Sequence, residues 1–245
     1  MERLAYREMA ELDQKHWWYR ARRRVLSDLI RREVAPPPGA RILEIGCGTG
    51  HNFEVLKQFG SVDAIELDDE SRAIAEERLG RSIMTSPLPE LAGVRGDYDL
   101  IAALDVIEHI DDDAAALASI TTKLKRGGKF VMAVPAHRWM WSAHDVVNHH
   151  KRRYSKRALR ALIEGSPLRL DKIGYFNSLL FPAAVAERMA SKLRGKDEGD
   201  LKLPAAPLNA AFEHTFASER HLIGRVPLPP GLSLFAVGSM EPVKD

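Results

Sequence analysis

The sequence has few of the features that mark disulfide-bonded, membrane-spanning or polyanion-binding proteins. Its 245 residues include a single cysteine, Cys47, so no internal disulfide can form, which suits a reducing compartment. The most apolar stretch, residues 173–186, is interrupted by polar residues and a proline and is too short to cross a bilayer. A net charge of +2 is too small to indicate a nucleic-acid binder.

The N-terminal segment also lacks the apolar core of a signal peptide, because charged residues recur throughout its first twenty positions. We therefore expect a soluble, cytoplasmic protein, with a peripheral membrane contact left open. What the chain does have is the material of a globular core, since 45% of its residues are hydrophobic and 29% charged. This length suits one large α/β domain.

Short apolar segments alternate with helix-like segments along the chain. Strands are expected at residues 41–45, 61–67, 81–84, 98–104, 129–134, 168–176 and 231–240, and helices at 51–60, 69–79, 112–125 and 155–165. This alternation predicts an α/β fold with a doubly wound, mostly parallel, seven-stranded sheet. Residues 177–230 exceed an ordinary connection and are expected to form a helical insertion before the last strand, acting as a lid or a dimerisation arm.

A glycine-rich loop follows the first strand in "RILEIGCGTGHN". Gly46, Gly48 and Gly50 recur at every second position, at the carboxyl end of a strand where such folds bind ligands. A dinucleotide loop would need a third glycine at position 51, which is His51. Glu44, two residues before the first glycine, would repel a pyrophosphate and attract a cation. The loop therefore favours a positively charged ligand without phosphate.

This loop, "LEIGCGTG", resembles the first motif of the class I S-adenosylmethionine-dependent methyltransferases, in the branch of small enzymes that includes ubiquinone-type O-methyltransferases. Glu66 in "AIELDD" stands where that family places an acid for the ribose hydroxyls. "YDLIAALDVIEHIDD" and "LKRGGKFVMAVP" are similar to its later motifs, so the likeness covers about residues 41–135. The resemblance implies a Rossmann-like methyltransferase fold, S-adenosylmethionine as cofactor and S-adenosylhomocysteine as product.

The resemblance also implies a set of cofactor contacts. The third-strand segment "SIMTSPLPEL" has hydroxyls where the family often has an acid for the adenine, so Ser86 is expected to accept that hydrogen bond and Leu88 to pack on the ring. The full expected set is Tyr19, Arg22, Glu44, Gly46, Cys47, Gly48, Gly50, Glu66, Leu67, Ser86, Leu88, Leu104 and Asp105.

The N-terminal "HWWYRARRRVL" resembles a segment that folds over the cofactor in related enzymes. On that interpretation residues 1–35 form a helical cover, Tyr19 supplies apolar surface and Arg22 or Arg23 pairs with the cofactor carboxylate. Residues 36–245 then form the cofactor-binding domain. The alternative is an amphipathic helix packed on the sheet with its basic residues in water.

Methyl transfer to a hydroxyl requires a proton acceptor, and a histidine titrates near working pH. His109 in "DVIEHI" is the expected base, although a histidine there can also simply pack beside the cofactor. His149 and Tyr154 are expected substrate-side residues. Some relatives use an acid-x-x-Glu-His pattern to bind magnesium, which Asp105, Glu108 and His109 approximate. Such a site needs further ligands, and His144, His149 and His150 could converge on it after folding, but we expect no metal here. Asp145, like His149 and Tyr154, is an expected substrate contact.

The sequence thus predicts a methyltransferase that acts on a small molecule, at an oxygen of an apolar or lipid-linked acceptor, as a monomer or homodimer. Two alternatives remain open. A nucleic-acid methyltransferase is disfavoured by the near-neutral charge, and no nucleic-acid partner is expected. A non-catalytic, cofactor-binding regulatory protein could have the same fold.

Overall fold

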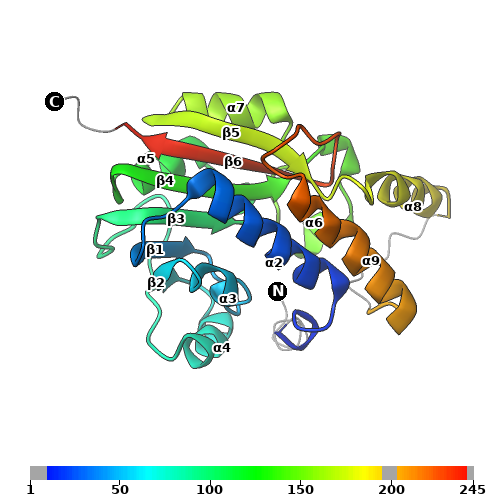
Figure 1. Cartoon of the computed structure of the whole chain (residues 1–245), viewed down its shortest axis with the longest axis horizontal. Coiled ribbons are helices and arrows are strands. Elements are labelled where there is room, and N and C mark those ends of the chain that lie inside the picture. The colour runs from blue at the N-terminus through cyan, green and yellow to red at the C-terminus, as the bar shows by residue number, and fades with distance from the viewer. Residues whose placement is uncertain (1–9, 195–202, 242–245) are drawn as a thin grey trace.

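One six-stranded sheet forms the centre of the molecule (Figure 1). The computed structural model describes residues 10–194 and 203–241. The strands are β1 Ala40–Ile45, β2 Gly60–Ile65, β3 Tyr98–Leu104, β4 Leu124–Pro135, β5 Leu168–Phe176 and β6 Ser233–Met240. Residues 195–202 of the expected insertion lie outside the described residues, as do the first nine residues of the expected cover.

The sheet is mostly parallel, which confirms the predicted α/β class. Its strand order is β2-β1-β3-β4-β6-β5, and only β6 runs antiparallel to its two neighbours. The predicted count of seven strands is wrong for the described residues. The segment at 81–84 forms one isolated bridge, between Ile65 and Met84. Pro87 follows three residues after Met84, and a proline has no N–H with which to continue a ladder.

Helices flank the sheet, and several of them begin at a side-chain cap. They are α2 Trp17–Leu29, α3 Phe53–Leu56, α4 Asp69–Leu79, α5 Asp113–Thr121, α6 Ala143–Val147, α7 Lys156–Glu164, α8 Phe181–Arg194 and α9 Ala206–Ser218. Asp68, Asp112 and Ser155 each accept the backbone N–H three residues on. The helix predicted to reach residue 125 is wrong at its end, because Leu124 already pairs with Tyr98 in the sheet.

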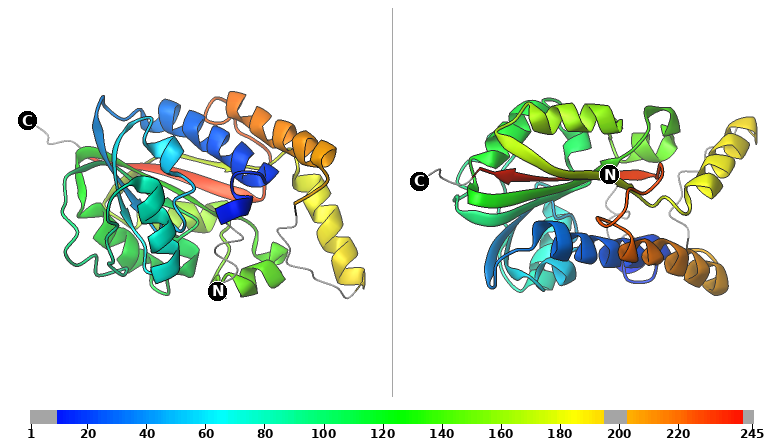
Figure 2. Two further views of the ribbon diagram at one scale, coloured as in Figure 1. Left: turned by 90° about the horizontal axis from the view of Figure 1, so that it is seen from below. Right: turned by 45° about the horizontal axis from the view of Figure 1, so that its top comes forward.

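Two apolar layers hold these helices against the two faces of the sheet. Side chains of α2, α3, α4 and α9 pack on one face, including Val25, Phe53 and Phe216. Side chains of α5 and α7 pack on the other, including Ile120 and Ile163. The tilted view in Figure 2 shows this sandwich, with α7 on one side of the sheet and α2 with α9 on the other.

The first described helix and the insertion pack side by side (Figures 1 and 2). The Asn209 side chain of α9 accepts the backbone N–H of Trp17 at 2.9 Å, and the Trp17 ring lies edge-on to Phe212 at 5.3 Å. Glu213 is 6% exposed, and its carboxylate forms salt bridges with Arg20 and Arg24 of α2, with N–O distances of 3.2 and 3.0 Å. Helices α8 and α9 confirm the predicted helical insertion; its role as a lid stays a prediction.

None of the helices in residues 10–194 and 203–241 combines the length and apolar character needed to span a bilayer. The carboxyl ends of β1, β2, β3 and β4 meet at one edge of the sheet, because these strands run in one direction. That edge brings the glycine loop, Glu66 and Asp105 together.

Candidate functional site

The glycine loop leaves β1 in a left-handed conformation that creates an open cradle. A Cβ on Gly46 would lie 2.7 Å from Cγ2 of Val106, so this position must be glycine for the loop to pack on the segment after β3. Gly48 differs, because no atom lies within 4 Å of where its Cβ would be and its φ is +54°. The backbone at Gly48 is therefore open to a ligand.

Glu66 ties this loop to the end of β2. Its Oε2 accepts the N–H of Gly48 at 2.7 Å, and its Oε1 accepts those of Leu67 and Asp68 at 2.8 and 2.9 Å. A carboxylate has about four lone-pair positions, so about one stays free for an outside donor. Leu67 beside it is 52% exposed and offers apolar surface at the same edge.

Glu44 lies fully buried beneath the loop. The Asn52 amide donates to its Oε1 at 2.8 Å, while Oε2 has no hydrogen-bond partner among the described residues. Burial raises the pKa of Glu44 to about 8, although the Asn52 hydrogen bond and Arg22 act in the opposite direction. The orphaned oxygen fits a cationic ligand better than an empty core.

We expect Glu44 to make folding stability fall as the pH rises. Its pKa is about 8 in the folded chain against the ordinary 4.5, so its stabilising contribution is complete below pH 4.5 and is lost as the pH rises through 8. Glu44→Gln should remove a loss of up to about 1.4 kcal/mol per pH unit in that window. Urea unfolding of both proteins at pH 5, 6.5 and 8 measures it, with exposed Glu54→Gln as control. Parallel stability curves for wild type and Glu44→Gln would contradict this assignment.

Arg22 reaches from α2 to the end of β3. Its guanidinium is 1% exposed, lies 2.6 Å from Asp105 Oδ2 and is stacked 5.2 Å from the Trp18 ring. Asp105 has a φ of +62°, a strained backbone for a non-glycine residue. Tyr19, 4% exposed, lies edge-on to His51 of the loop. The sequence-predicted Arg22 and Asp105 are thus brought together, whereas Arg23 points elsewhere and donates to the Asp13 carbonyl.

The remaining predicted cofactor residues are mostly enclosed. Cys47 is fully buried, its N–H donates to the Ile65 carbonyl, and burial raises the pKa of its thiol. The buried Ser86 hydroxyl donates to the Ala92 carbonyl, which leaves its oxygen free to accept. Leu88 packs with the apolar layer under α5, and Leu104 is 4% exposed. These positions can shape a ligand site, but they present little open surface.

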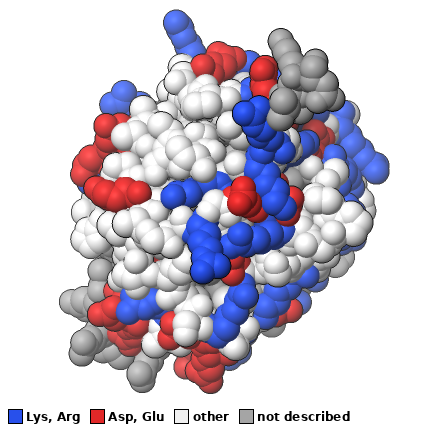
Figure 3. Space-filling model, turned by 90° about the vertical axis from the view of Figure 1, so that its left-hand side faces the viewer, with Lys and Arg blue, Asp and Glu red and all other residues white. Residues whose placement is uncertain are grey.

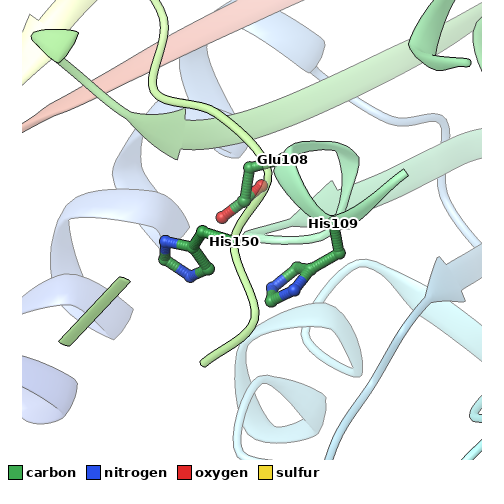
Figure 4. Close-up of side chains that lie close together, drawn as sticks. All are labelled: Glu108, His109 and His150. Atoms are coloured by element: carbon green, nitrogen blue, oxygen red, sulfur yellow. The ribbon is translucent and has the colours of Figure 1, made fainter. Parts of the chain in front are cut away.

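A second group of polar side chains lies where the chain leaves β3. Glu108, His109 and His150 point toward one another, and one ligand atom from each lies within 4.8 Å of the others (Figure 4). The two imidazole rings are 4.8 Å apart and nearly perpendicular. Glu108 is fully buried with both carboxylate oxygens unpartnered among the described residues; burial and then Asp105 raise its pKa well above the ordinary value.

Asp145 of α6 orients His150. Its fully buried carboxylate lies 2.9 Å from His150 Nδ1 and accepts Arg153 Nε at 2.7 Å and the Ser142 N–H at 2.8 Å. Burial alone would raise the pKa of Asp145, but the hydrogen bonds from His150 and Arg153 outweigh it and hold that pKa below its usual range. With Nδ1 engaged by Asp145, Nε2 is the His150 nitrogen left to face the cluster.

His109 meets the cluster from the other side. Burial and the neighbouring His150 lower its pKa, so its imidazole stays neutral at pH values where a free histidine would be protonated. Two imidazoles and a carboxyl at this spacing can accept a proton or hold a divalent ion, for which Glu108, His109 and His150 are the ligands that the described residues offer.

The other two predicted catalytic residues, His149 and Tyr154, add no ligand atom to this cluster, although the His149 backbone forms a hydrogen bond with His109 and its charge acts to lower the His109 pKa. His149 is exposed, with a φ of +55°. The Tyr154 hydroxyl donates to Asp113 at 2.7 Å, and its ring is buried in the layer under α7. The sequence pointed to His150 as a possible metal ligand and to Asp145 as a substrate contact, but it did not predict the hydrogen bond between them. The two residues are five positions apart across one short helix, and this spacing matches neither the helical nor the strand period that sequence analysis searches for.

Comparisons with known proteins agree with this geometry. The family model described as "Methyltransferase domain" matches residues 17–172. The ubiquinone biosynthesis O-methyltransferase of Xanthomonas axonopodis pv. citri is 30% identical over 104 residues, which are 40% of this chain and 44% of that protein. The protein of the same name from Parvibaculum lavamentivorans is 32% identical over 111 residues, 43% of this chain and 44% of its own. The chain thus spans less than half the length of these curated relatives.

Solved structures share the fold. A chain of the Haloferax volcanii complex between the Trm112 methyltransferase activator and a methyltransferase has a TM-score of 0.63 and 16% identity, over 99% of this chain and 96% of that one. Phosphoethanolamine N-methyltransferase 2 of Haemonchus contortus, solved with S-adenosylmethionine, has a TM-score of 0.57 and 17% identity, over 88% and 51% of the two chains. With its glycine loop, its sheet and a family match over well more than half its length, the chain belongs to the methyltransferase domain family, as a class I S-adenosylmethionine-dependent methyltransferase.

Proposed function

We propose that this methyltransferase methylates an oxygen of a small, apolar or lipid-linked molecule. The observation that carries the proposal is the group of His109, His150 and Asp145 beside the end of β3, which also bears Asp105 and the glycine-loop contact Val106. An acceptor hydroxyl must lose a proton as its oxygen gains the methyl group, and neutral imidazoles can take it. The curated relatives named above are O-methyltransferases by name, which supports the choice of oxygen.

The residues at the loop fit S-adenosylmethionine. The open backbone at Gly48 and the unpartnered oxygen of Glu44 suit a ligand that approaches closely and carries positive charge. We assign the free lone pair of Glu66 to a ribose hydroxyl, and Ser86 and Leu88 to the adenine. The cofactor supplies the methyl group on a sulfonium leaving group. The protein's task is to align the acceptor with it and to remove a proton.

Exposed aromatic side chains support an apolar acceptor. Trp139 follows β4 and is 53% exposed, and its ring lies edge-on to Phe181 at 6.2 Å. The His137 ring lies 5.0 Å from the Phe181 ring and stacks on the Tyr175 ring at 5.4 Å, measured between ring centroids. Such a wall of rings can hold a bulky apolar molecule without hydrogen bonds.

We expect Glu66→Ala to weaken binding of S-adenosylhomocysteine by about 10- to 100-fold, because hydrogen bonds to a charged group contribute about 1.5–3 kcal/mol. Calorimetry with the purified chain measures this, and Glu54→Ala, whose side chain is 81% exposed, is the matched control. The acceptor class is tested by incubating the wild type with S-adenosylmethionine and separate pools of quinols, catechols and polyprenyl phenols. A methylated product identified by mass spectrometry is the expected result.

Three outcomes would contradict parts of the proposal. Undetectable binding of the product cofactor by the wild type, or unchanged binding in Glu66→Ala, would remove the cofactor assignment. Tight cofactor binding without turnover of any pool would favour a regulatory protein. Methylation of RNA or DNA alone would favour the nucleic-acid alternative.

The charge distribution disfavours that last alternative. The face at which the parallel strands begin carries many lysines and arginines, but acidic side chains are interleaved with them (Figure 3). Asp63 lies 3.4 Å from Arg41 and 2.7 Å from Arg81, and Asp99 lies 2.8 Å from Lys125. A phosphate backbone is bound by positive charge that lacks such partners.

A second use of the histidine cluster is favoured by one observation, the unpartnered carboxylate of Glu108. A divalent cation would satisfy both oxygens and use the two imidazoles, with Asp145 fixing His150 in the ligating tautomer. Its test is joined below to that of His150.

A further inference from the structure

The arginines of α2 divide between two sides of the helix. The Arg22 side chain faces inward to Asp105. The other α2 arginines near it, Arg20, Arg23 and Arg24, line a surface hollow of about 420 Å³. This hollow lies between α2, α3 and the turn Glu219–His221. It is lined by Arg20, Arg23, Arg24, Ser27, Asp28, Arg31, Glu54, Val55, Gln58 and Arg220. None of these residues belongs to the cofactor site described above.

Positive charge exceeds negative charge in the hollow. Arg20 and Arg24 share the single carboxylate of Glu213, and Arg31 lies 2.7 Å from Asp28. Glu54 does not compensate the others, because its side chain is 81% exposed and its ion pair is with Lys57 at 4.0 Å. Arg23 and Arg220 have no carboxylate within ion-pair distance in the described part of the chain. Two guanidinium groups, those of Arg23 and Arg220, therefore lie at the hollow without an ion-pair partner in the described part of the chain, and two more share one carboxylate.

Arg23, which lines the hollow, has a hydrogen-bond donor that the described residues leave unsatisfied, although the Asp13 carboxylate lies near it. Its Nη2 donates to the Asp13 carbonyl at 2.7 Å, but its Nη1 is buried and has no acceptor among the described residues. Burial, together with Arg78 and Arg20, lowers its pKa, although Asp13 acts the other way. A buried guanidinium nitrogen without an acceptor is costly, and an anionic oxygen would remove that cost.

We propose that this hollow binds a phosphate-bearing anion. Guanidinium groups bind phosphate oxygens through paired, charge-assisted hydrogen bonds, and several of them can share one phosphate group. The volume exceeds that of a single phosphate and admits a diphosphate or a phosphorylated small molecule. A phospholipid headgroup offers the same chemistry, and the two sources are separated by experiment.

The hollow is lined by α2, and the same helix carries Arg22, which contacts Asp105 at the cofactor-binding edge of the sheet. Arg23 is adjacent in sequence to Arg22, and the hollow also touches α3 and the turn after α9. A bound anion would therefore link α2 to α3 and to that turn. Binding should raise the melting temperature of the wild type.

The test uses pyrophosphate as the soluble probe and the full chain as the protein. We expect calorimetry to detect binding that weakens at least tenfold in Arg23→Gln/Arg220→Gln, the two arginines without carboxylate partners. Arg157→Gln/Arg160→Gln removes the same charge from exposed positions of α7 and should bind like the wild type. If the first double variant unfolds, the single rim variant Arg220→Glu replaces it. Unfolding curves and binding of S-adenosylhomocysteine show that the fold and cofactor site are intact.

A vesicle arm separates the sources. Cosedimentation with phosphatidylglycerol vesicles but not phosphatidylcholine vesicles, lost in Arg220→Glu, would identify a headgroup. Pyrophosphate binding without vesicle binding would identify a soluble phosphate compound. Absence of both, or equal loss of pyrophosphate binding in the α7 control, would overturn the proposal. Because cofactor binding is measured separately, failure here leaves the proposed function untouched.

Discussion

His150→Ala is expected to lower kcat by about 10²- to 10⁴-fold, the range that a positioned general base contributes. The reason is the geometry of the cluster: Asp145 engages Nδ1 at 2.9 Å, and the ring faces Glu108 and His109. His149→Ala is the matched control, because it removes the adjacent histidine from an exposed position. Single-turnover rates with the acceptor found by the screen measure the effect. Equal losses in the two variants would contradict the assignment.

The pH profile tells a base from a purely structural histidine. The pKa of His109 lies below that of a free histidine, so a rate that depends on its neutral form should reach its plateau at a lower pH than a free histidine would give. Asp145→Asn should shift the profile and lower kcat more than it changes KM, since Asp145 acts by positioning His150. A loss of rate that is the same at every pH would indicate that Asp145 only holds the fold.

A metal would leave a different signature at the same residues. Titration of the chelator-treated wild type with Co²⁺ should then produce a visible absorption band that is absent in Glu108→Gln and His150→Ala and present in His149→Ala. The rate would also fall on chelation and return with the cation. An unchanged rate after chelation, together with no absorption band, would rule out the metal and leave proton acceptance as the role of the cluster.

The second large effect is expected at Arg22. Arg22→Gln should lower the free energy of unfolding by about 1.5–3 kcal/mol, because the buried guanidinium loses its hydrogen bond to the Asp105 carboxylate, which is itself 31% exposed. Arg20→Gln removes a half-exposed member of the Glu213 pair and should cost about 0–1 kcal/mol. Urea unfolding at pH 7 compares the two.

Cofactor binding by the same variants tests whether the pair matters beyond stability. Asp105 lies at the end of β3 with a strained backbone, so loss of Arg22 should also weaken S-adenosylhomocysteine binding. The double variant Arg22→Met/Asp105→Asn should recover part of the stability, since it removes both charges. A penalty for Arg22→Gln no larger than that of Arg20→Gln would show that the pair is not buried in solution.

The parts of the fold that depend on local pattern were predictable. The strands predicted at 98–104 and 168–176 coincide with β3 and β5, and the helices predicted at 69–79 and 155–165 match α4 and α7 to within one residue at each end. The overlong helix was not, because Gly127 looks like a helix stop and in fact lies within β4, with a φ of +74°. Whether a glycine ends a helix or bends a strand depends on its partners, here Tyr98 opposite Leu124.

The same distinction applies to the site. The glycine loop and Glu66 follow their strands directly, so the sequence order places them together. The partners of His109 are set by tertiary structure. The loop after β4 folds back so that the Lys151 N–H donates to the Glu108 carbonyl, and this brings His150 to the cluster while His149 turns outward. Adjacent histidines have identical local signals, and only the folded chain separates them.

The interlock of α2 with α9 has a mechanical consequence. Glu213 binds two arginines of α2 and Asn209 binds the start of that helix, so the two helices form one rigid plate. On the prediction that α2 covers the cofactor edge, uncovering that edge would move both helices together. A cross-link from either helix to the sheet would therefore slow cofactor exchange. The two cross-linking positions would be far apart in sequence, because Trp17 and Asn209 are separated by 192 residues.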